Sequence, residues 1–206
     1  MRSVFFSLLF LLAFTASSSP STGSAAKGLI PTNSIYQLTD TFTDQNGKKF
    51  NLAERRGQVS PAGGTENKVQ LVAMFYGSCK YACPLIIDSA KAVEHALSPK
   101  LRSKLAVLLI SFDPARDTPP VLAALVLERK LDPSRWTLAR TESSGVRKVA
   151  ALLGVRYREL ADGEFNHSSQ LILLDAQGRF LARTEKMGGV PESEFMQVLE
   201  QALSGE

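Results

Sequence analysis

The chain has 206 residues, 44% of them hydrophobic, which suits one globular domain with a sizeable core and excludes a disordered or collagen-like chain. Lysine and arginine number 24 against 20 aspartate and glutamate residues, giving a formal net charge of +4. Because the basic residues are spread along the chain rather than clustered, we expect a solvated, mildly basic surface and no nucleic-acid binding.

The beginning of the chain has the residue order of a secretory signal. Residues 1–19 open with Arg2, run apolar from Val4 to Phe14 and then turn to small and hydroxylated side chains. This run is shorter than the ~20 residues that span a bilayer as a helix, although an uncleaved N-terminal membrane anchor stays an alternative. Residues 20–34, rich in Ser, Gly, Ala and Pro, predict a flexible linker. We therefore expect export to an oxidising compartment, either free in the periplasm or membrane-anchored and facing it, and less so to an intermembrane space.

The sequence pattern predicts strands in the first part of the folded domain. From Ile35 to Leu52 the sequence alternates and turns at Gln45-Asn46-Gly47, a hairpin signal between two short strands. The glycine-rich stretch at 57–67 predicts an exposed loop. Residues 69–76, VQLVAMFY, form a continuous apolar run that is typical of a strand buried on both faces.

Helices and strands alternate over the rest of the chain. After Pro84, apolar residues recur at threes and fours, which predicts an amphipathic helix that ends near Ser98-Pro99. The later predicted elements are a buried strand at 105–112, a helix from Thr118 to about Lys130, a short strand at 136–138, a helix at 142–154, a strand–turn–strand at 170–183 and a helix at 191–203. We therefore predict that residues 35–206 form an α/β, thioredoxin-like domain: a mixed sheet flanked by helices, with an N-terminal β-hairpin extension.

Both cysteines of the chain, Cys79 and Cys83, lie in the stretch GSCKYACP. This stretch follows the strand at 69–76, and Pro84 is expected to begin the next helix, so both thiols lie at or just before a helix N-terminus. Free N–H groups and the helix dipole favour thiolate there, and thiolate both exchanges disulfides and binds metals. A disulfide across so short a loop would stabilise little, which disfavours a purely structural bridge. The position predicts reactive cysteines without deciding between redox and metal chemistry.

A third ligand would complete a metal site, and the chain has only 2 histidines. Two thiolates with one imidazole suit copper and also zinc. His95 lies about three turns along the helix that follows Pro84, so we expect it to be a solvated surface residue. His167 lies in a predicted loop just before a core strand, and a thioredoxin-type sheet can bring such a loop beside the cysteine motif. A loop histidine satisfied by backbone groups is the alternative interpretation.

Three ordered motifs between about Tyr36 and Phe195 resemble those of the Sco/SenC copper proteins, which are associated with cytochrome c oxidase assembly. These motifs are FYGSCKYACP around the cysteines, SFDPARDTP at 111–119 and HSSQLILLDAQGRF at 167–180. The resemblance implies that Cys79, Cys83 and His167 bind Cu(I) or Cu(II). It also implies that Asp113 lies near the metal or helps a partner to dock.

The resemblance further implies a metallochaperone that delivers copper to, or prepares the cysteines of, the binuclear copper site of the oxidase. The expected partner is the copper-receiving subunit of a respiratory oxidase or another exported copper enzyme. From the residues themselves, Asp113 and Asp117 are equally typical of a turn and a helix cap, and Arg116 is expected to pair with a nearby carboxylate.

The main alternative is an enzyme-like thiol–disulfide oxidoreductase that uses Cys79 and Cys83 as a catalytic redox pair and needs no histidine. A peroxidase of the peroxiredoxin kind is disfavoured, because Tyr76 stands where that family usually has threonine. Ser78 and Lys80 depart from the residues common in the Sco/SenC motif, and Lys80 adds a positive charge that favours thiolate but opposes a bound cation.

Overall fold

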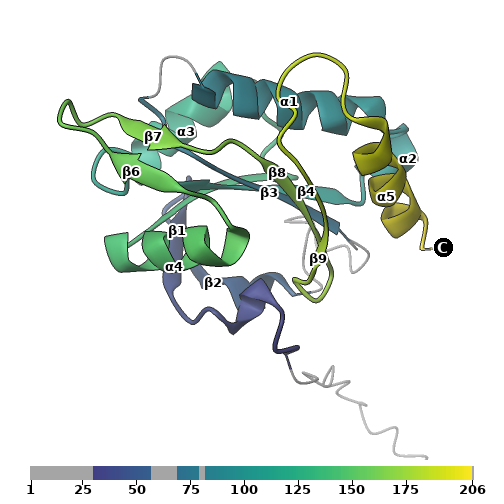
Figure 1. Cartoon of the computed structure of the whole chain (residues 1–206), viewed down its shortest axis with the longest axis horizontal. Helices are drawn as coiled ribbons and strands as arrows, with labels where there is room; N and C mark the ends of the chain where they lie inside the picture. The colour runs from purple at the N-terminus through teal and green to yellow at the C-terminus, as the bar shows by residue number, and fades with distance from the viewer. Residues whose placement is uncertain (1–29, 57–68, 79–81, 206) are drawn as a thin grey trace, which may run out of the picture.

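The structure, a computed structural model, describes residues 30–56, 69–78 and 82–205, the last range without the side chains of Ala82 and Cys83 (Figure 1). The signal or anchor expected at 1–19, most of the linker and the loop expected at 57–67 lie outside the described residues. A seven-stranded mixed sheet has the order β2-β1-β5-β4-β3-β8-β9, and β6 and β7 form a second, two-stranded sheet. The strands are β1 Thr41–Asp44, β2 Lys49–Asn51, β3 Val69–Phe75, β4 Leu105–Ser111, β5 Trp136–Thr141, β6 Tyr157–Glu159, β7 Phe165–His167, β8 Leu171–Asp175 and β9 Phe180–Thr184.

Helices cover both faces of the large sheet, as the alternation of strands and helices predicts. In Figure 1, α1, α3 and α5 lie above the sheet and α4 lies below it. The helices are α1 Ala82–Ala96, α2 Pro99–Arg102, α3 Pro119–Glu128, α4 Ser143–Leu153 and α5 Ser193–Ser204, with the 3-10 helices η1 Ile35–Gln37 and η2 Leu52–Arg55. The predicted mixed α/β architecture is confirmed.

The two central strands, β3 and β4, are buried along their whole length. Their sequences are almost continuous apolar runs, as expected for parallel strands that are covered on both faces. They pair in parallel from Val69 opposite Leu105 to Phe75 opposite Ser111, while β8 pairs antiparallel with the other edge of β3. The carboxyl ends of β3 and β4 therefore lie side by side, and so do the beginnings of the two loops that follow them.

The predicted N-terminal hairpin is confirmed and extends the large sheet. β1 pairs antiparallel with both β2 and β5. The residues before it also belong to the domain, because Ile35 and Tyr36 are only 1% and 2% exposed. The Ser34 hydroxyl accepts the N–H of Tyr36, and the N–H of Ile35 donates to the carbonyl of Gly178 at 3.0 Å. Ser34, the last residue of the predicted linker, therefore packs with the folded domain.

The structure differs from the sequence-based predictions in three places. α1 begins at Ala82, so Pro84 lies inside the first turn, where a missing N–H removes no intrahelical hydrogen bond. The short helix α2 was not predicted, although Ser98 caps it and Pro99 opens it. The strands β6 and β7 were not predicted either, and their hairpin carries His167.

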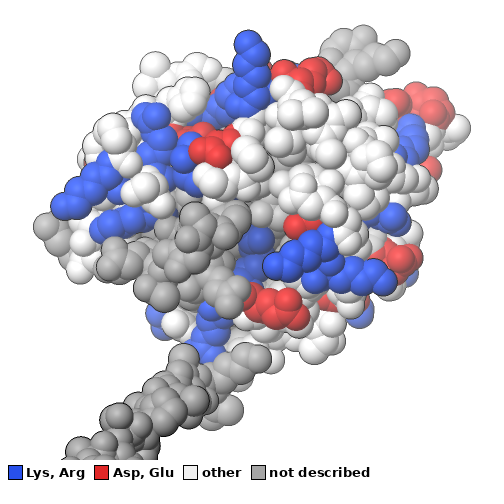
Figure 2. Space-filling view, turned by 180° about the vertical axis from the view of Figure 1, so that it is seen from behind, with Lys and Arg blue, Asp and Glu red and all other residues white. Residues whose placement is uncertain are grey.

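Charged side chains of both signs share the surface. Figure 2 shows lysine and arginine scattered among aspartate and glutamate on the rear face of the molecule, which agrees with a solvated basic surface. Within the described residues, no helix combines the length and the apolar character needed to cross a bilayer.

Candidate metal centre

The cysteine motif connects the end of β3 to the start of α1, as predicted. Gly77 and Ser78 form a turn after β3, and the backbone of Cys83 lies in the first turn of α1. Cys79 lies outside the described residues, and the side chain of Cys83 is not among those described. Within the described part of the chain, no cluster of three or more His, Cys, Asp or Glu side chains could hold a metal ion.

His167 is the last residue of β7, which corrects its predicted place in a loop. Its half-buried ring lies 5.9 Å from the ring of Tyr76 and 4.9 Å from that of Phe112, between centroids. Tyr76 directly follows β3, so the structure brings His167 beside the strand end that leads into the cysteine motif.

The His167 ring has one nitrogen engaged by the backbone. Nδ1 lies 3.2 Å from the carbonyl oxygen of Ser168. A carbonyl only accepts, so Nδ1 is the donor of this contact, and Nε2 is the ring nitrogen that remains for a ligand. Metal-binding histidines commonly have this arrangement, in which a backbone carbonyl fixes the tautomer. His167 also borders an open groove of about 330 Å³, shared with Arg156, Tyr157, Arg158, Asn166 and Ser168, so a ligand can reach this part of the hairpin.

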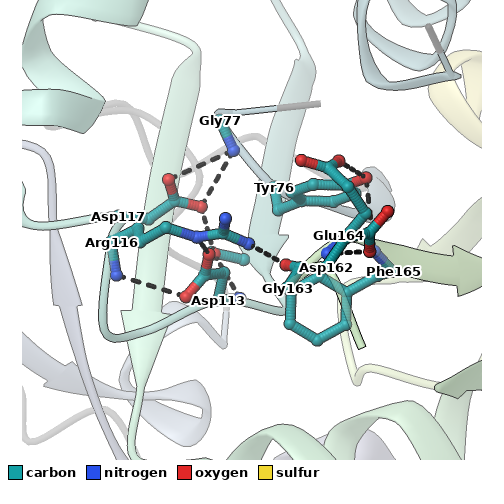
Figure 3. A network of polar contacts seen from close by, with 10 residues as sticks. Tyr76, Gly77, Asp113, Arg116, Asp117, Asp162, Gly163, Glu164 and Phe165 are labelled. Atoms are coloured by element: carbon teal, nitrogen blue, oxygen red, sulfur yellow. Dashed lines mark hydrogen bonds and ion pairs between the residues drawn. The ribbon is translucent and has the colours of Figure 1, made fainter. Parts of the chain in front are cut away.

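One hydrogen bond and one aromatic contact hold the β6–β7 hairpin against the end of β3. The Tyr76 hydroxyl donates to Oε2 of Glu164 at 2.8 Å, and its ring meets Phe165 edge-on at 5.1 Å between centroids (Figure 3). Glu164 and Phe165 lie close before His167 along the same hairpin. The hydrogen bond and the ring contact together hold the histidine strand against the end of β3.

Asp117 joins the second motif to the cysteine motif. Its carboxylate is almost fully buried and accepts the N–H of Gly77 at 3.1 and 3.0 Å and the hydroxyl of Ser111. A Cβ atom at Gly77 would lie 2.7 Å from Oδ1 of Asp117, so the close approach requires glycine. Burial raises the pKa of Asp117, and the hydrogen bonds from Ser111 and Gly77 oppose that rise. The predicted helix-cap role is wrong, because Thr118 is the N-cap residue of α3.

Asp113 and Arg116 form the predicted ion pair. Asp113 is 5% exposed, and its carboxylate accepts both the backbone N–H and Nε of Arg116, which confirms the turn interpretation of this motif. Nη2 of Arg116 donates to the carbonyl of Gly163, in the turn between β6 and β7. The second motif therefore contacts both the end of β3 and the histidine hairpin (Figure 3).

Sequence reasoning missed Glu164 and the actual role of Asp117. Glu164 lies in a short polar stretch without a recognised motif, and the only signal was its place close before His167. His95 behaves as predicted, because it is exposed on α1.

Known proteins share this fold. ScoI of Bradyrhizobium japonicum, solved with copper bound, is 26% identical, with a TM-score of 0.62, over 79% of this chain and 96% of that chain. A SCO1/SenC family lipoprotein from Bacillus anthracis str. Ames is 19% identical, with a TM-score of 0.66, over 79% and 91% of the two chains. BsSco, described as a Sco family member with a disulfide switch, is 18% identical, with a TM-score of 0.63, over 81% and 92%. No curated protein matches the sequence.

The family model supplies the assignment. The three structural neighbours named above are Sco proteins, which agrees with the predicted thioredoxin-like fold. The match to the SCO1/SenC model runs from residue 39 to residue 204 and includes all three motifs. Since that match covers most of the sequence, this chain belongs to the SCO1/SenC family.

Proposed function

We propose that this protein binds copper through Cys79, Cys83 and His167 and acts as a metallochaperone in cytochrome c oxidase assembly. The observation that carries the proposal is the setting of His167, whose ring lies against Tyr76 with Nδ1 held by a backbone carbonyl. Family membership supports it, since the Bradyrhizobium japonicum relative was solved with copper bound.

The proposed ligands have the chemistry that copper prefers. Cysteine thiolates are soft ligands and imidazole is a borderline one, so the set accepts Cu(I) and Cu(II). The backbone of Cys83 lies in the first turn of α1. At this end of a helix the dipole and the free N–H groups favour the thiolate form of cysteine. A site with three protein ligands leaves copper open to a donor from a partner. Such a site suits a protein that passes its metal on.

The proposed partner is the copper-receiving subunit of a respiratory oxidase, or another exported copper enzyme. The apolar segment from Val4 to Phe14 supports export, with the domain either free in the periplasm or anchored to the membrane and facing it. The mixed surface charge agrees with a protein partner rather than a nucleic acid.

The ligand set is tested by the copper affinity of the reduced protein, measured in competition with a chelator of known affinity. We expect about one copper per chain, and affinity lower by on the order of a hundredfold or more after Cys79→Ser, Cys83→Ser or His167→Ala. His95→Ala is the matched control because it removes the other, exposed histidine. Unchanged affinity in His167→Ala would contradict the three-ligand site.

A second candidate is a thiol–disulfide reductase that keeps the copper-ligand cysteines of a target reduced. The start of α1 at the cysteine motif supports it, because this position also activates a thiolate for exchange. The Cys79 and Cys83 thiols would lose two electrons and two protons, which the target disulfide would gain. A single-cysteine variant should then attack the disulfide form of the target and remain trapped in a mixed disulfide with it, and a pair inert towards target disulfides would exclude this role.

A further inference from the structure

A closed ring of contacts connects the end of β3 to the hairpin that carries His167. Starting from Gly77, it runs through Asp117 and Ser111 to Asp113, whose N–H donates to the Ser111 hydroxyl at 2.9 Å. It continues through Arg116 to the carbonyl of Gly163. The Tyr76–Glu164 hydrogen bond closes the ring, because Glu164 follows Gly163 in the hairpin and Tyr76 precedes Gly77. Figure 3 shows Asp113, Arg116 and Asp117 together on one side of this ring and Tyr76 beside Glu164 on the other.

The Tyr76–Glu164 hydrogen bond is the step of this ring nearest to His167. The hydroxyl donates to Glu164 at 2.8 Å and lies 3.5 Å from the amide nitrogen of Phe165. Phe165 begins the strand that ends at His167, and Glu164 directly precedes it. The planes of the Tyr76 and His167 rings meet edge-on at 84°. The same tyrosine therefore contacts the histidine and holds the strand that carries it.

Side-chain contacts, and not strand pairing with the large sheet, hold the β6–β7 hairpin in this position. Within the described residues the hairpin pairs only with itself, over three residue pairs, and is not part of the large sheet. Two-stranded hairpins are marginal in water without packing against another element. Its described links to the domain include the rings around Phe112, the Arg116 contact to Gly163 and the Tyr76–Glu164 hydrogen bond.

We infer that Tyr76 and Glu164 are positioning residues that hold His167 beside the end of β3 before copper arrives. This inference rests on the proposed function and names residues that act through His167 without binding the metal. Groups that orient metal ligands typically change metal affinity by about 10–100-fold when they are removed. The hydroxyl of Tyr76 and the side chain of Glu164 should therefore affect copper binding far more than stability.

The test compares Tyr76→Phe, Glu164→Ala and Glu164→Gln with Tyr157→Phe as the matched control. Tyr76→Phe keeps the ring on His167 and removes only the hydroxyl, whereas Gln at position 164 can still accept from it. The Tyr157 hydroxyl has no hydrogen bond within the described residues, so its removal tests the loss of a nearby phenol alone. Copper affinity, the Cu(II) absorption spectrum and the melting temperature of the copper-free protein are measured for each.

We expect copper affinity to fall about tenfold or more in Tyr76→Phe and Glu164→Ala, with an altered Cu(II) spectrum and nearly unchanged melting temperature. Glu164→Gln and Tyr157→Phe should stay close to the parent. Parent-like affinity and spectrum in both Tyr76→Phe and Glu164→Ala would overturn the inference while leaving the proposed copper site intact.

A copper-free measurement separates this inference from the proposed function. The chain has 2 histidines, so their imidazole NMR signals can be assigned with the His95→Ala variant. We expect the His167 signals to shift and broaden in Tyr76→Phe and Glu164→Ala, while those of the exposed His95 stay unchanged. Unchanged His167 signals would show that the hydrogen bond does not position the ring, whatever the protein binds.

Discussion

At the scale of single residues, Asp117 shows how one buried carboxylate can organise two motifs. It accepts hydrogen bonds from Gly77, two residues after β3, and from Ser111, the last residue of the neighbouring strand β4. Burying a charge is unfavourable unless hydrogen bonds compensate for the lost water. Asp117 therefore ties the stability of this region to pH.

The raised pKa of Asp117 predicts the sign of that dependence. Because the folded protein holds the proton more tightly than the unfolded chain, this residue stabilises the fold most below its unfolded pKa of about 3.9. Its contribution declines as pH rises through the folded pKa. Burial is the main cause, and the neighbouring charges of Asp113 and Arg116 act in opposite directions.

Asp117→Asn should therefore gain unfolding free energy relative to the parent as pH rises from about 4 to about 7. Urea denaturation at a series of pH values measures the difference, with the exposed Asp88→Asn as the control. A parent–variant difference that stays constant across this range would show that ionising Asp117 has no energetic consequence.

At the scale of elements, a buried polar contact that no sequence motif predicts joins α1 to β5. Glu94 on α1 is 4% exposed and accepts the indole N–H of Trp136 at 3.0 Å and Nε of Arg135 at 2.7 Å. Trp136 itself is almost fully buried. The contact holds the C-terminal end of α1, the helix that begins at the cysteine motif.

Glu94→Ala should destabilise the protein by about 2–3 kcal/mol, because it leaves a buried indole N–H without an acceptor and breaks an ion pair. Glu94→Gln keeps an acceptor for the indole and should cost less. Urea denaturation measures both variants. Equal losses would contradict the importance of the Trp136 hydrogen bond and assign the effect to the charge alone.

Most of the fold could be predicted because its central elements have strong local patterns. The apolar runs of β3 and β4 and the period of α1 are long enough to be read without tertiary information. The strands β6 and β7 have three residues each and mix tyrosine, phenylalanine, arginine and asparagine. Their strand conformation depends on packing against Phe112 and Tyr76, which no local pattern encodes.

The site was predictable in part for a similar reason. The family resemblance identified His167 as an expected ligand, and a thioredoxin-type sheet order predicts that it lies near the cysteine motif. Its position on a strand could not be predicted, because that position depends on contacts between residues distant in sequence. Asp117 looks like a helix cap beside Thr118 and Pro119. Only the parallel pairing of β3 with β4 shows that its carboxylate reaches Gly77 instead.

At the scale of the whole molecule, the domain is larger than the stretch that defines the family. The SCO1/SenC match begins at residue 39, yet Ile35 and Tyr36 are among the buried core residues. They dock on the turn between β8 and β9, where a Cβ atom at Gly178 would lie 2.7 Å from Oγ of Ser34. The segment before residue 39 thus packs against the turn that joins β8 to β9.

A chain that begins at residue 39 should therefore be less stable than one that begins at residue 30. The loss should be roughly 3–6 kcal/mol, since burying a large apolar side chain contributes roughly 1.5–3 kcal/mol and two are removed. Thermal and urea denaturation of the two proteins measure it. Equal stability would show that η1 contributes nothing to the core.

The central claim is that His167 completes a copper site with Cys79 and Cys83, and the most direct test is the coordination of Cu(II) by the full chain. Absorption and electron paramagnetic resonance spectra of the protein with one equivalent of Cu(II) should show thiolate-to-copper charge transfer and nitrogen coordination. His167→Ala should lose the nitrogen signal and His95→Ala should keep it. A nitrogen signal that survives in His167→Ala, or the absence of thiolate charge transfer in the parent, would contradict the account.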